Sequence, residues 1–484
     1  MSTSGSGTGH VVVIGAGIAG LAAAHRLLGR GTRVTVVEAS DRVGGKLLPG
    51  EIAGVRVDLG AESMLARRPE ALDLAREVGL TDGLRPPATA TASIWTRGAL
   101  RPMPKGHVMG VPGTAAALAG VLSDEGLARV ERDAELPRTE VGDDVAVGEY
   151  VAARLGREVV DRLVEPLLGG VYAGDAYRIS MRSAVPQLFQ AARTHDSLTE
   201  AVREIQAKAA ASGQTGPVFM GIEGGVGRLP LAVARSVRAR GAEILTGARV
   251  TELRRTAPTG WQVVAGERVL RADAVVVAVP APAAAALLGA ESPAAAAELR
   301  TVEYASMALI TLAYRRADAA LPEGSGFLVP PVDGRTIKAS TFASRKWGWI
   351  ADEDPDVLVL RTSVGRYGET EILEREDAHL VDASRHDLRE ATGLDAEPLQ
   401  TRVTRWDDGL PQYPVGHHAR VARIREEVAK LPGLAVCGAQ YDGVGIPACI
   451  ASAYAAVDRL GGDTRGVEEL TANPVQSLHG GAGE

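Results

Sequence analysis

The feature that most constrains this chain lies close to its N-terminus, where a short apolar run is followed at once by a glycine-rich turn. His10 to Ile14 is rich in β-branched residues and predicts a buried parallel strand, and residues 21–28 predict a helix. Between them stands Gly15-Ala-Gly17-Ile-Ala-Gly20. A second predicted strand, Arg33 to Val37, ends on Glu38. This order of strand, glycine turn, helix, strand and acid predicts a βαβ unit that binds a dinucleotide.

Each glycine of the turn has a distinct structural role. Gly15 permits the tight turn, Gly17 lets the backbone approach a pyrophosphate, and Gly20 lets the helix pack closely on the strand. The start of the helix offers free N–H groups and the positive end of its dipole to the phosphates. Glu38 stands where a carboxylate can accept hydrogen bonds from a ribose diol, and it disfavours the 2′-phosphate of NADP. FAD and NAD both fit the pattern up to this point.

A second glycine motif follows Glu38 and favours FAD. It reads Ala39-Ser-Asp-Arg42-Val-Gly44-Gly45-Lys46. It resembles the segment of the amine oxidase-like flavoprotein superfamily in which an arginine and a pair of glycines follow the second strand. Two glycines and a basic side chain can wrap the far side of the cofactor's phosphates and ribose, and folds that bind NAD alone have no such segment. Lys46 stands where the superfamily more often has Arg, so a point charge replaces a bidentate fork.

Three later stretches resemble further parts of the superfamily's FAD site. Asp58 to Ser63 resembles the stretch whose glycine turn brings backbone donors to the isoalloxazine edge, and Val250 aligns with a position that contacts the adenine. The glycine loop from Gly438 to Ile446 leads into a predicted helix, whose N-terminus can hold the anionic edge of a reduced flavin. The predicted cofactor-binding residues are Gly15, Ala16, Gly17, Ile18, Ala19, Gly20, Glu38, Ala39, Arg42, Gly44, Gly45, Lys46, Gly60, Ala61, Glu62, Ser63, Val250, Trp406, Gly438, Val444, Gly445 and Ile446.

The predicted elements describe an α/β protein with an FAD-binding Rossmann-like domain, a mixed-sheet substrate domain and a helical lobe. In the lobe, Asp143 and Asp144 predict the cap of a helix at Val145, and Asp196 and Ser197 the cap of a second helix. A Gly-rich, polar end predicts a disordered tail. The predicted ranges are 1–85, 215–290 and 430–463 for the FAD domain, 86–112 and 291–429 for the substrate domain, 113–214 for the lobe, and 464–484 for the tail.

Composition excludes several classes of protein. The net charge of −7 leaves no basic excess for phosphates, so we expect no nucleic-acid partner. Cys437 and Cys449 are too few for a disulfide scaffold and wrongly spaced for a metal site, so we expect two buried thiols and no metal. The longest apolar stretch, residues 274–290, contains Pro280 and Pro282 and is too short for a membrane span. We expect a cytoplasmic protein without a signal peptide or an integral membrane segment.

The resemblance becomes more specific in the middle of the chain. Glu165-Pro-Leu-Leu-Gly-Gly-Val-Tyr172-Ala-Gly174-Asp175 resembles the signature of the porphyrinogen oxidases, as do the segments that begin at Arg101 and Thr404. The similarity covers nearly the whole chain and is closest to the soluble enzymes of Gram-positive bacteria that oxidise coproporphyrinogen III. It implies that Trp406 neighbours the cofactor, that Gly174 lines the substrate cavity and that Arg68 faces a propionate. Ala448 departs from the family pattern, which usually has an Asp there.

The family implies a six-electron oxidation of coproporphyrinogen III to coproporphyrin III in haem biosynthesis. It would proceed in three steps, each passing a hydride to flavin N5, with dioxygen as acceptor and hydrogen peroxide as product. The flavin carries the chemistry, and a catalytic base need not exist, because pyrrole N–H protons can leave to water. Other expected partners are a second copy of the chain in a homodimer and a ferrochelatase that receives the product.

Four propionates on the substrate call for cationic groups around an apolar slot. We expect Arg68 and Lys338 to bind propionates, and Tyr172 and Gly174 to wall the cavity. The full set of basic candidates is Arg67, Arg68, Arg101, Lys105, Lys338, Arg345 and Lys346.

Several alternatives stay open on sequence alone. Protoporphyrinogen IX has two vinyls where coproporphyrinogen III has two more propionates, so the choice depends on whether charge or apolar groups stand at those positions. An amine oxidase shares the first motifs, but that family often has an aromatic cage or a flavin-linked Cys near the last glycine loop. The signature at 172–175 disfavours carotenoid desaturases. Intact phosphate-facing glycines and Glu38 disfavour a non-catalytic flavin-fold binding protein.

Overall fold

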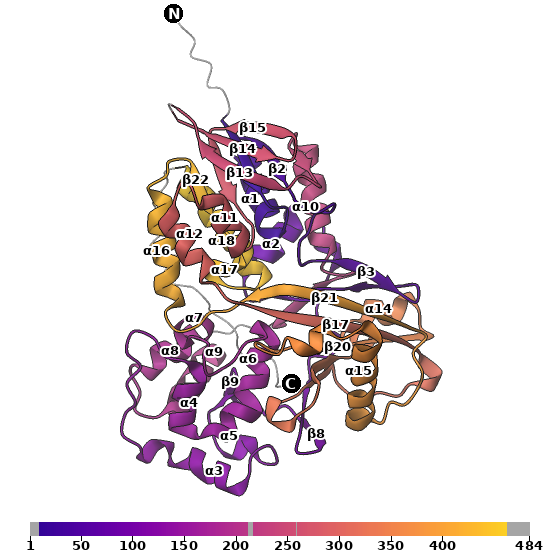
Figure 1. Cartoon of the computed structure of the whole chain (residues 1–484). Coiled ribbons are helices and arrows are strands. Elements are labelled where there is room, and N and C mark those ends of the chain that lie inside the picture. Colours follow the sequence, from indigo (N-terminus) through magenta and orange to yellow (C-terminus); the bar gives the residue numbers. More distant parts are fainter. Residues whose placement is uncertain (1–8, 212–215, 258, 462–484) are drawn as a thin grey trace, which may run out of the picture.

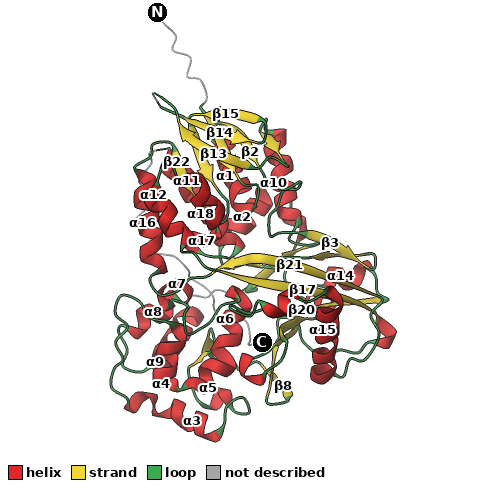
Figure 2. Ribbon diagram, in the orientation of Figure 1, coloured by secondary structure: helices red, strands yellow, loops and turns green. Residues whose placement is uncertain are grey.

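The computed structural model describes residues 9–211, 216–257 and 259–461. They form the predicted α/β fold, with a parallel sheet covered by helices, a long mixed sheet and a lobe of helices (Figure 1). In Figure 2 the long strands of the mixed sheet cross the middle of the molecule, between the two parts richest in helices. The predicted tail, 464–484, lies outside the described residues, and the domain boundaries stay predictions.

The parallel sheet joins three separate stretches of the chain. All of its strand pairings are parallel. In spatial order its strands are β12 (Glu243–Leu245), β2 (Arg33–Val37), β1 (His10–Ile14), β16 (Ala274–Val277) and β22 (Leu434–Val436).

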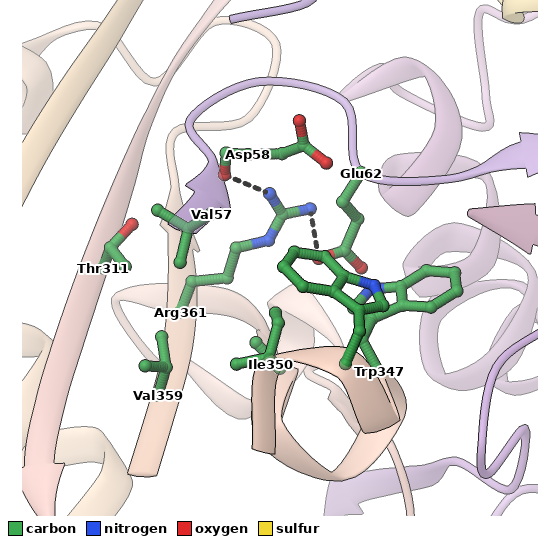
Figure 3. Close-up of a pocket in the computed structure, with 10 residues that line it drawn as sticks. Val57, Asp58, Glu62, Thr311, Trp347, Ile350, Val359 and Arg361 are labelled. Carbon is green, nitrogen blue, oxygen red and sulfur yellow. Dashed lines mark hydrogen bonds and ion pairs between the residues drawn. The ribbon is translucent and has the colours of Figure 1, made fainter. Parts of the chain in front are cut away.

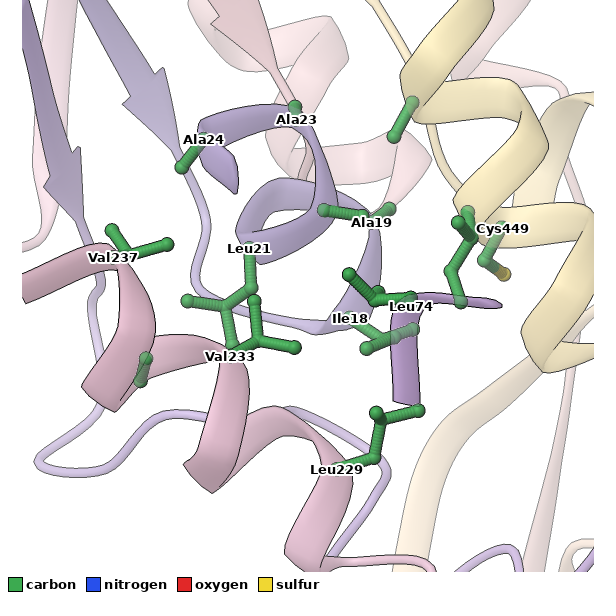
Figure 4. Packing of buried hydrophobic residues seen from close by; sticks show 14 of the residues in the cluster. Ile18, Ala19, Leu21, Ala23, Ala24, Leu74, Leu229, Val233, Val237 and Cys449 are labelled. Carbon is green, nitrogen blue, oxygen red and sulfur yellow. The ribbon is translucent and has the colours of Figure 1, made fainter. Parts of the chain in front are cut away.

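Both faces of this sheet are buried, which explains its continuous apolar strands. Val11 and Val13 pack into one cluster, whereas Val12 and Ile14 pack into another on the opposite face. Figure 4 shows part of the first cluster, where Leu21 of one helix meets Val233 of another. The first face is covered by α1 (Ile18–Gly29), α2 (Pro69–Glu77), α10 (Arg228–Ala239) and α18 (Ile446–Leu460). The second is covered by α11 (Ala281–Leu288), α12 (Pro293–Arg300), α16 (His417–Ala429) and the antiparallel strands β13 (Val250–Arg255), β14 (Trp261–Ala265) and β15 (Arg268–Ala272).

The mixed sheet lies below the parallel one in Figure 1. A register shift between Ile337 and Ala339 makes Lys338 the extra residue of a β-bulge. One face packs against α15 (Asp377–Thr392), and the other packs against α13 (Ala343–Lys346), α14 (Gly348–Glu353) and the hairpin of β3 (Pro49–Ile52) and β4 (Val55–Asp58). The strands in order are β21 (Gln400–Pro411), β17 (Tyr304–Arg315), β20 (Val357–Val364), β19 (Ile337–Thr341), β18 (Gly326–Leu328), β7 (Ser93–Thr96) and β8 (Ala99–Pro102).

The helical lobe confirms one predicted cap and corrects the other. Ser197 Oγ accepts a hydrogen bond from Glu200 N (3.2 Å) at the start of α9. The helix predicted from Val145 begins two residues later and has no side-chain cap, because the Asp144 carboxylate accepts the Ser180 hydroxyl instead (2.7 Å). The helices of the lobe are α3 (Asp124–Glu131), α4 (Val147–Leu155), α5 (Arg157–Val159), α6 (Glu165–Tyr172), α7 (Met181–Ala184), α8 (Pro186–Ala192) and α9 (Leu198–Ala211).

The remaining elements are short. They are β5 (Met64–Leu65), β6 (Leu84–Arg85), β9 (His107–Val108), β10 (Val111–Pro112), β11 (Phe219–Ile222) and α17 (Ala439–Asp442). Within the described ranges, the helices are all too short or too polar to cross a membrane.

Candidate functional site

The first glycine turn, between β1 and α1, is shaped by close packing except at one position. Gly15 has a φ of +104°, and a Cβ on it would lie 2.5 Å from Ala278 O. A Cβ on Gly20 would lie only 1.9 Å from Gly15 O, so the helix and the turn touch there. A Cβ on Gly17 would meet nothing within 4 Å. Gly17 therefore faces open space at the position where the motif brings the backbone to a phosphate.

The second glycine motif packs directly on the first. Gly44 N donates to Ala16 O (2.8 Å), and a Cβ on Gly45 would lie 3.2 Å from Gly17 Cα. Arg42 Nη2 donates to Gly45 O (2.9 Å) and fixes the shape of this loop.

The acid that follows β2 lies at the same place. The Glu38 carboxylate accepts Ala16 N (2.7 Å) and Ser40 N (2.8 Å), so it stands beside the glycine turn. Gly17, the residue before α1, offers no side-chain cap, which leaves the first N–H groups of the helix available. Uncapped donors, open space and an adjacent carboxylate fit the phosphates and ribose of FAD.

The remaining predicted cofactor residues differ in what they expose. Ile18, Ala19 and Ile446 bury their side chains in the core, so only their backbones can face a ligand, whereas Ala39 and Ala61 are exposed. Ala248 N donates to Glu38 O (2.9 Å), which brings the start of Val250's strand beside the acid. Val444 packs against the core of the helical lobe, and Ser63 is half-buried.

The stretch that follows β4 packs against Lys46 and Trp406 at Gly60. A Cβ on Gly60 would lie 2.0 Å from Lys46 O and 3.2 Å from Trp406 Cζ2. Trp406 Nε1 also donates to Leu59 O (3.0 Å). Burial lowers the pKa of the Lys46 ammonium. These contacts bring predicted flavin neighbours from residues 46–60 together with Trp406, which lies far away in the sequence.

The last glycine loop leads into α18, whose preceding residue, Gly445, offers no side-chain cap. Gly443 has a φ of +142°, and a Cβ on it would lie 2.7 Å from Ala448 Cβ, so Ala448 fits closely against this loop. Both cysteines are buried and free, as expected. Burial raises the pKa of each thiol to about 12, so Cys449, in the first turn of α18, stays protonated at neutral pH.

Glu62 was predicted to contact the cofactor, and the structure places its carboxylate, 10% exposed, in an ion triad with Lys346 and Arg361. Figure 3 shows the Glu62–Arg361 pair of this triad. Lys346 Nζ lies 2.6 Å from Glu62 Oε1, and Arg361 Nη2 lies 3.2 Å from Oε2. Burial alone would raise the pKa of Glu62, but the two cations hold it below its usual value. Arg361 Nη1 also donates to Gly60 O (2.9 Å), so the triad fixes the backbone of the predicted flavin-contacting stretch.

A small cavity beside this triad is lined by Asp58, Thr311, Trp349 and Ile350, among others (Figure 3). The Asp58 carboxylate accepts Val226 N (2.7 Å) and Gly227 N (2.8 Å) and so ties β4 to the start of α10. Burial raises the pKa of Asp58 to about 6, although these two N–H groups oppose the shift.

Helix α6 packs against β18 and β19 of the mixed sheet and carries Tyr172, which was predicted to wall the substrate cavity. Tyr172 is buried, and its ring centroid lies 5.7 Å from that of Tyr413. Gln412 Nε2 donates to Tyr172 O (2.9 Å), and a Cβ on Gly174 would lie 2.3 Å from Gln412 Oε1. Gly174 therefore leaves no room for a side chain, and Gln412, which lies in the family-like segment that begins at Thr404, is a neighbour that was not among the predicted site residues.

The basic residues that were candidates for binding propionates differ in their hydrogen-bond and ion-pair partners. Arg68 precedes α2 and pairs with Glu70 (Nη2–Oε1 2.5 Å), and Lys346 pairs with Glu62, so each of these two cations already has a carboxylate partner. Arg345 Nη2 donates to Leu321 O (2.8 Å). Lys105 is exposed, and Arg101 Nε is buried without a hydrogen bond to the described residues. Lys338 is buried, and its Nζ donates to Gly365 O (2.8 Å).

Comparison of the sequence with known proteins identifies the family of this chain. The family model described as flavin containing amine oxidoreductase matches residues 18–461. The coproporphyrinogen III oxidase of Mycobacterium tuberculosis is 40% identical over 452 residues, covering 92% of this chain and 96% of that protein. The coproporphyrinogen III oxidase of Bacillus subtilis is 34% identical over 464 residues, covering 93% of this chain and 97% of that protein.

Solved structures show the same fold. The crystal structure of a putative protoporphyrinogen oxidase from Exiguobacterium sp. 255-15 superposes with a TM-score of 0.83 at 31% identity, covering 94% of this chain and 99% of that one. A putrescine oxidase variant has a TM-score of 0.70 at 16% identity, covering 94% of this chain and 99% of that one, and shows the fold alone.

Proposed function

The chain belongs to the family of flavin containing amine oxidoreductases and is an FAD-dependent oxidase, and from this premise we propose that it oxidises coproporphyrinogen III to coproporphyrin III. The observation that supports the proposal most is the likeness to curated relatives of that name, which extends over more than nine-tenths of both chains. The predicted signature, residues 165–175, adds to this support, because it forms α6 and the turn after it beside the mixed sheet.

FAD supplies the redox chemistry when it is bound, as a two-electron acceptor that dioxygen reoxidises with formation of hydrogen peroxide. The chain's part is to hold the cofactor and orient the substrate. The two glycine motifs and Glu38 would hold the phosphates and a ribose, and Lys46 would add a positive charge beside them. The Glu62 triad would keep the Gly60 backbone in place at the flavin.

The protons of the reaction need no protein base. Burial lowers the pKa of His417 to about 4, and its Nε2 is occupied by Tyr441 O (3.0 Å), so it is neutral and engaged. Burial also raises the pKa of Tyr172 and Tyr413 above the ordinary value of a phenol. These groups are poor proton acceptors, so we propose that the pyrrole N–H protons leave to water. Tyr172 and Gly174 would shape the apolar wall along which the macrocycle lies.

The proposal is tested by adding coproporphyrinogen III to the purified, FAD-loaded protein in air. We expect coproporphyrin fluorescence to appear much faster than in a protein-free control, with about one hydrogen peroxide for each two electrons removed. Protoporphyrinogen IX, the alternative substrate, and putrescine are compared in the same assay. A rate with coproporphyrinogen III equal to the protein-free control would contradict the proposal. A homodimer, a cytoplasmic location and hand-over to a ferrochelatase stay predictions.

A further inference from the structure

Two cations with little exposure to solvent lie close together outside the proposed flavin site, because Lys338 Nζ donates to Gly365 O and Arg366 Nη2 donates to Ile337 O. Lys338 on β19 is 8% exposed, and the side chain of Arg366, in the loop after β20, is 10% exposed. Burial is the main reason why the pKa of Lys338 falls to about 7, and the charge of Arg366 lowers it further. The two charged groups are therefore close enough to repel each other.

Lys338 and Arg366 have few hydrogen-bond acceptors around them, and most of these are distant. Lys338 makes no ion pair with any described residue, and its one hydrogen bond goes to Gly365 O (2.8 Å). The Arg366 guanidinium reaches two backbone carbonyls only at 3.4 Å, and it reaches the half-exposed Glu369 at 3.4 Å. Burying cations without well-placed acceptors is costly, and Lys338, whose pKa is about 7, carries only part of its charge at neutral pH unless an anion binds beside it.

The half-buried Glu165 is a carboxyl close enough to interact with Arg366, and it cannot neutralise the pair fully. Its Oε2 already accepts Ala176 N (2.6 Å). Burial raises the pKa of Glu165 to about 7, and the nearby Asp175 raises it further, so this group carries only part of a charge at neutral pH.

The position of the pair connects it to the proposed substrate cavity. The bulge in β19 interrupts the regular alternation of the strand at Lys338, and α6 packs on this strand. Tyr367, next to Arg366, donates its N–H to Ala173 O (2.7 Å). Ala173 stands between Tyr172 and Gly174, so the loop that carries Arg366 is bonded to the predicted cavity wall.

We propose that Lys338 and Arg366 form a binding site for a carboxylate, namely a propionate that coproporphyrinogen III carries where protoporphyrinogen IX carries a vinyl. A planar guanidinium can hold a carboxylate with two parallel hydrogen bonds while the ammonium adds a point charge. A vinyl at the same place would leave both cations buried without an acceptor. The site would thus select the macrocycle with four propionates. This inference rests on the proposed function.

The test compares variants K338M and R366Q with the wild type on both porphyrinogens. We expect each variant to raise KM for coproporphyrinogen III at least about tenfold, because a buried charge contact is lost, and to change kcat less than about twofold. We expect KM for protoporphyrinogen IX to change less than about twofold. K338R, which keeps the charge, should retain most of the affinity. R385Q is the matched control, because it removes a cation of α15 that is paired with the exposed Glu397.

A second measurement separates binding from a structural role. Removing one of two adjacent cations relieves repulsion, so the temperature at which K338M releases its flavin should equal or exceed that of the wild type. Direct titration with coproporphyrin III should show the same loss of affinity as KM. A lower release temperature with unchanged KM, or an equal rise of KM for both substrates, would overturn the inference. A wild type that forms no coproporphyrin would instead overturn the proposed function.

Discussion

Replacing Gly20 by alanine tests whether close contact between α1 and the glycine turn is needed to hold FAD. A Cβ at this position would lie 1.9 Å from Gly15 O, whereas an ordinary carbon–oxygen contact is roughly 3.3 Å. The start of α1 would therefore have to move back by roughly 3.3 − 1.9 = 1.4 Å. Such overpacking costs about 1–3 kcal/mol. It also moves the uncapped N–H groups away from the phosphates.

The same helix offers a matched control. A Cβ on Gly29, at the other end of α1, would meet only Arg240 Nη2 at 3.6 Å. G29A should be neutral or stabilise the protein by about 0.5–1 kcal/mol, since alanine favours a helix more than glycine does.

The assay is the ratio of flavin absorbance to protein absorbance after purification, together with the midpoint of thermal flavin release. We expect G20A to lose most of its FAD and to melt several degrees lower, while G29A keeps the wild-type values. Equal flavin content and equal melting in the two variants would refute the reasoning, because it would show that the packing at Gly20 does not position the phosphate site.

Three further predictions follow from single contacts. The Asp58 carboxyl has a pKa of about 6 in the fold and an ordinary value of 3.8 outside it, so its contribution to stability is fully present below pH 3.8 and is lost as the pH rises through about 6. D58N should flatten this part of the curve of melting temperature against pH, and an unchanged curve would contradict the assignment. R154M should destabilise the helical lobe by about 3–5 kcal/mol in chemical denaturation, because it leaves the buried Asp133 (Nε–Oδ1 2.7 Å in the wild type) without its cation, and a loss below about 1 kcal/mol would contradict it. G174A should lower kcat/KM for coproporphyrinogen III at least about tenfold through its clash with Gln412, and Q412A should restore part of it in the double variant, whereas strictly additive effects would argue against that contact.

The elements that local signals define were predictable from the sequence. The order of apolar strand, glycine turn and helix at residues 10–29 appears in the structure because each signal lies within a few residues of the element that it specifies. The same holds for the helix after the last glycine loop and for the cap at Ser197. The cap predicted at Asp144 failed because a distant hydroxyl, that of Ser180, competes for the carboxylate, and no local pattern contains that partner.

The partners of charged residues were not predictable for the same reason. Glu62 and Lys346 are separated by 284 positions, yet they form one ion pair, and the third member of the triad, Arg361, belongs to no motif. Motif reasoning predicted a cofactor contact for Glu62 and placed Lys346 among the basic candidates for a propionate, but it contained no signal that the two side chains form an ion pair. Only the three-dimensional pairing shows which cations already have a carboxylate. Among the described residues, Lys338 is the buried candidate that pairs with no carboxylate, and this makes its surroundings a better guide to the substrate's negative charge than its place in the sequence.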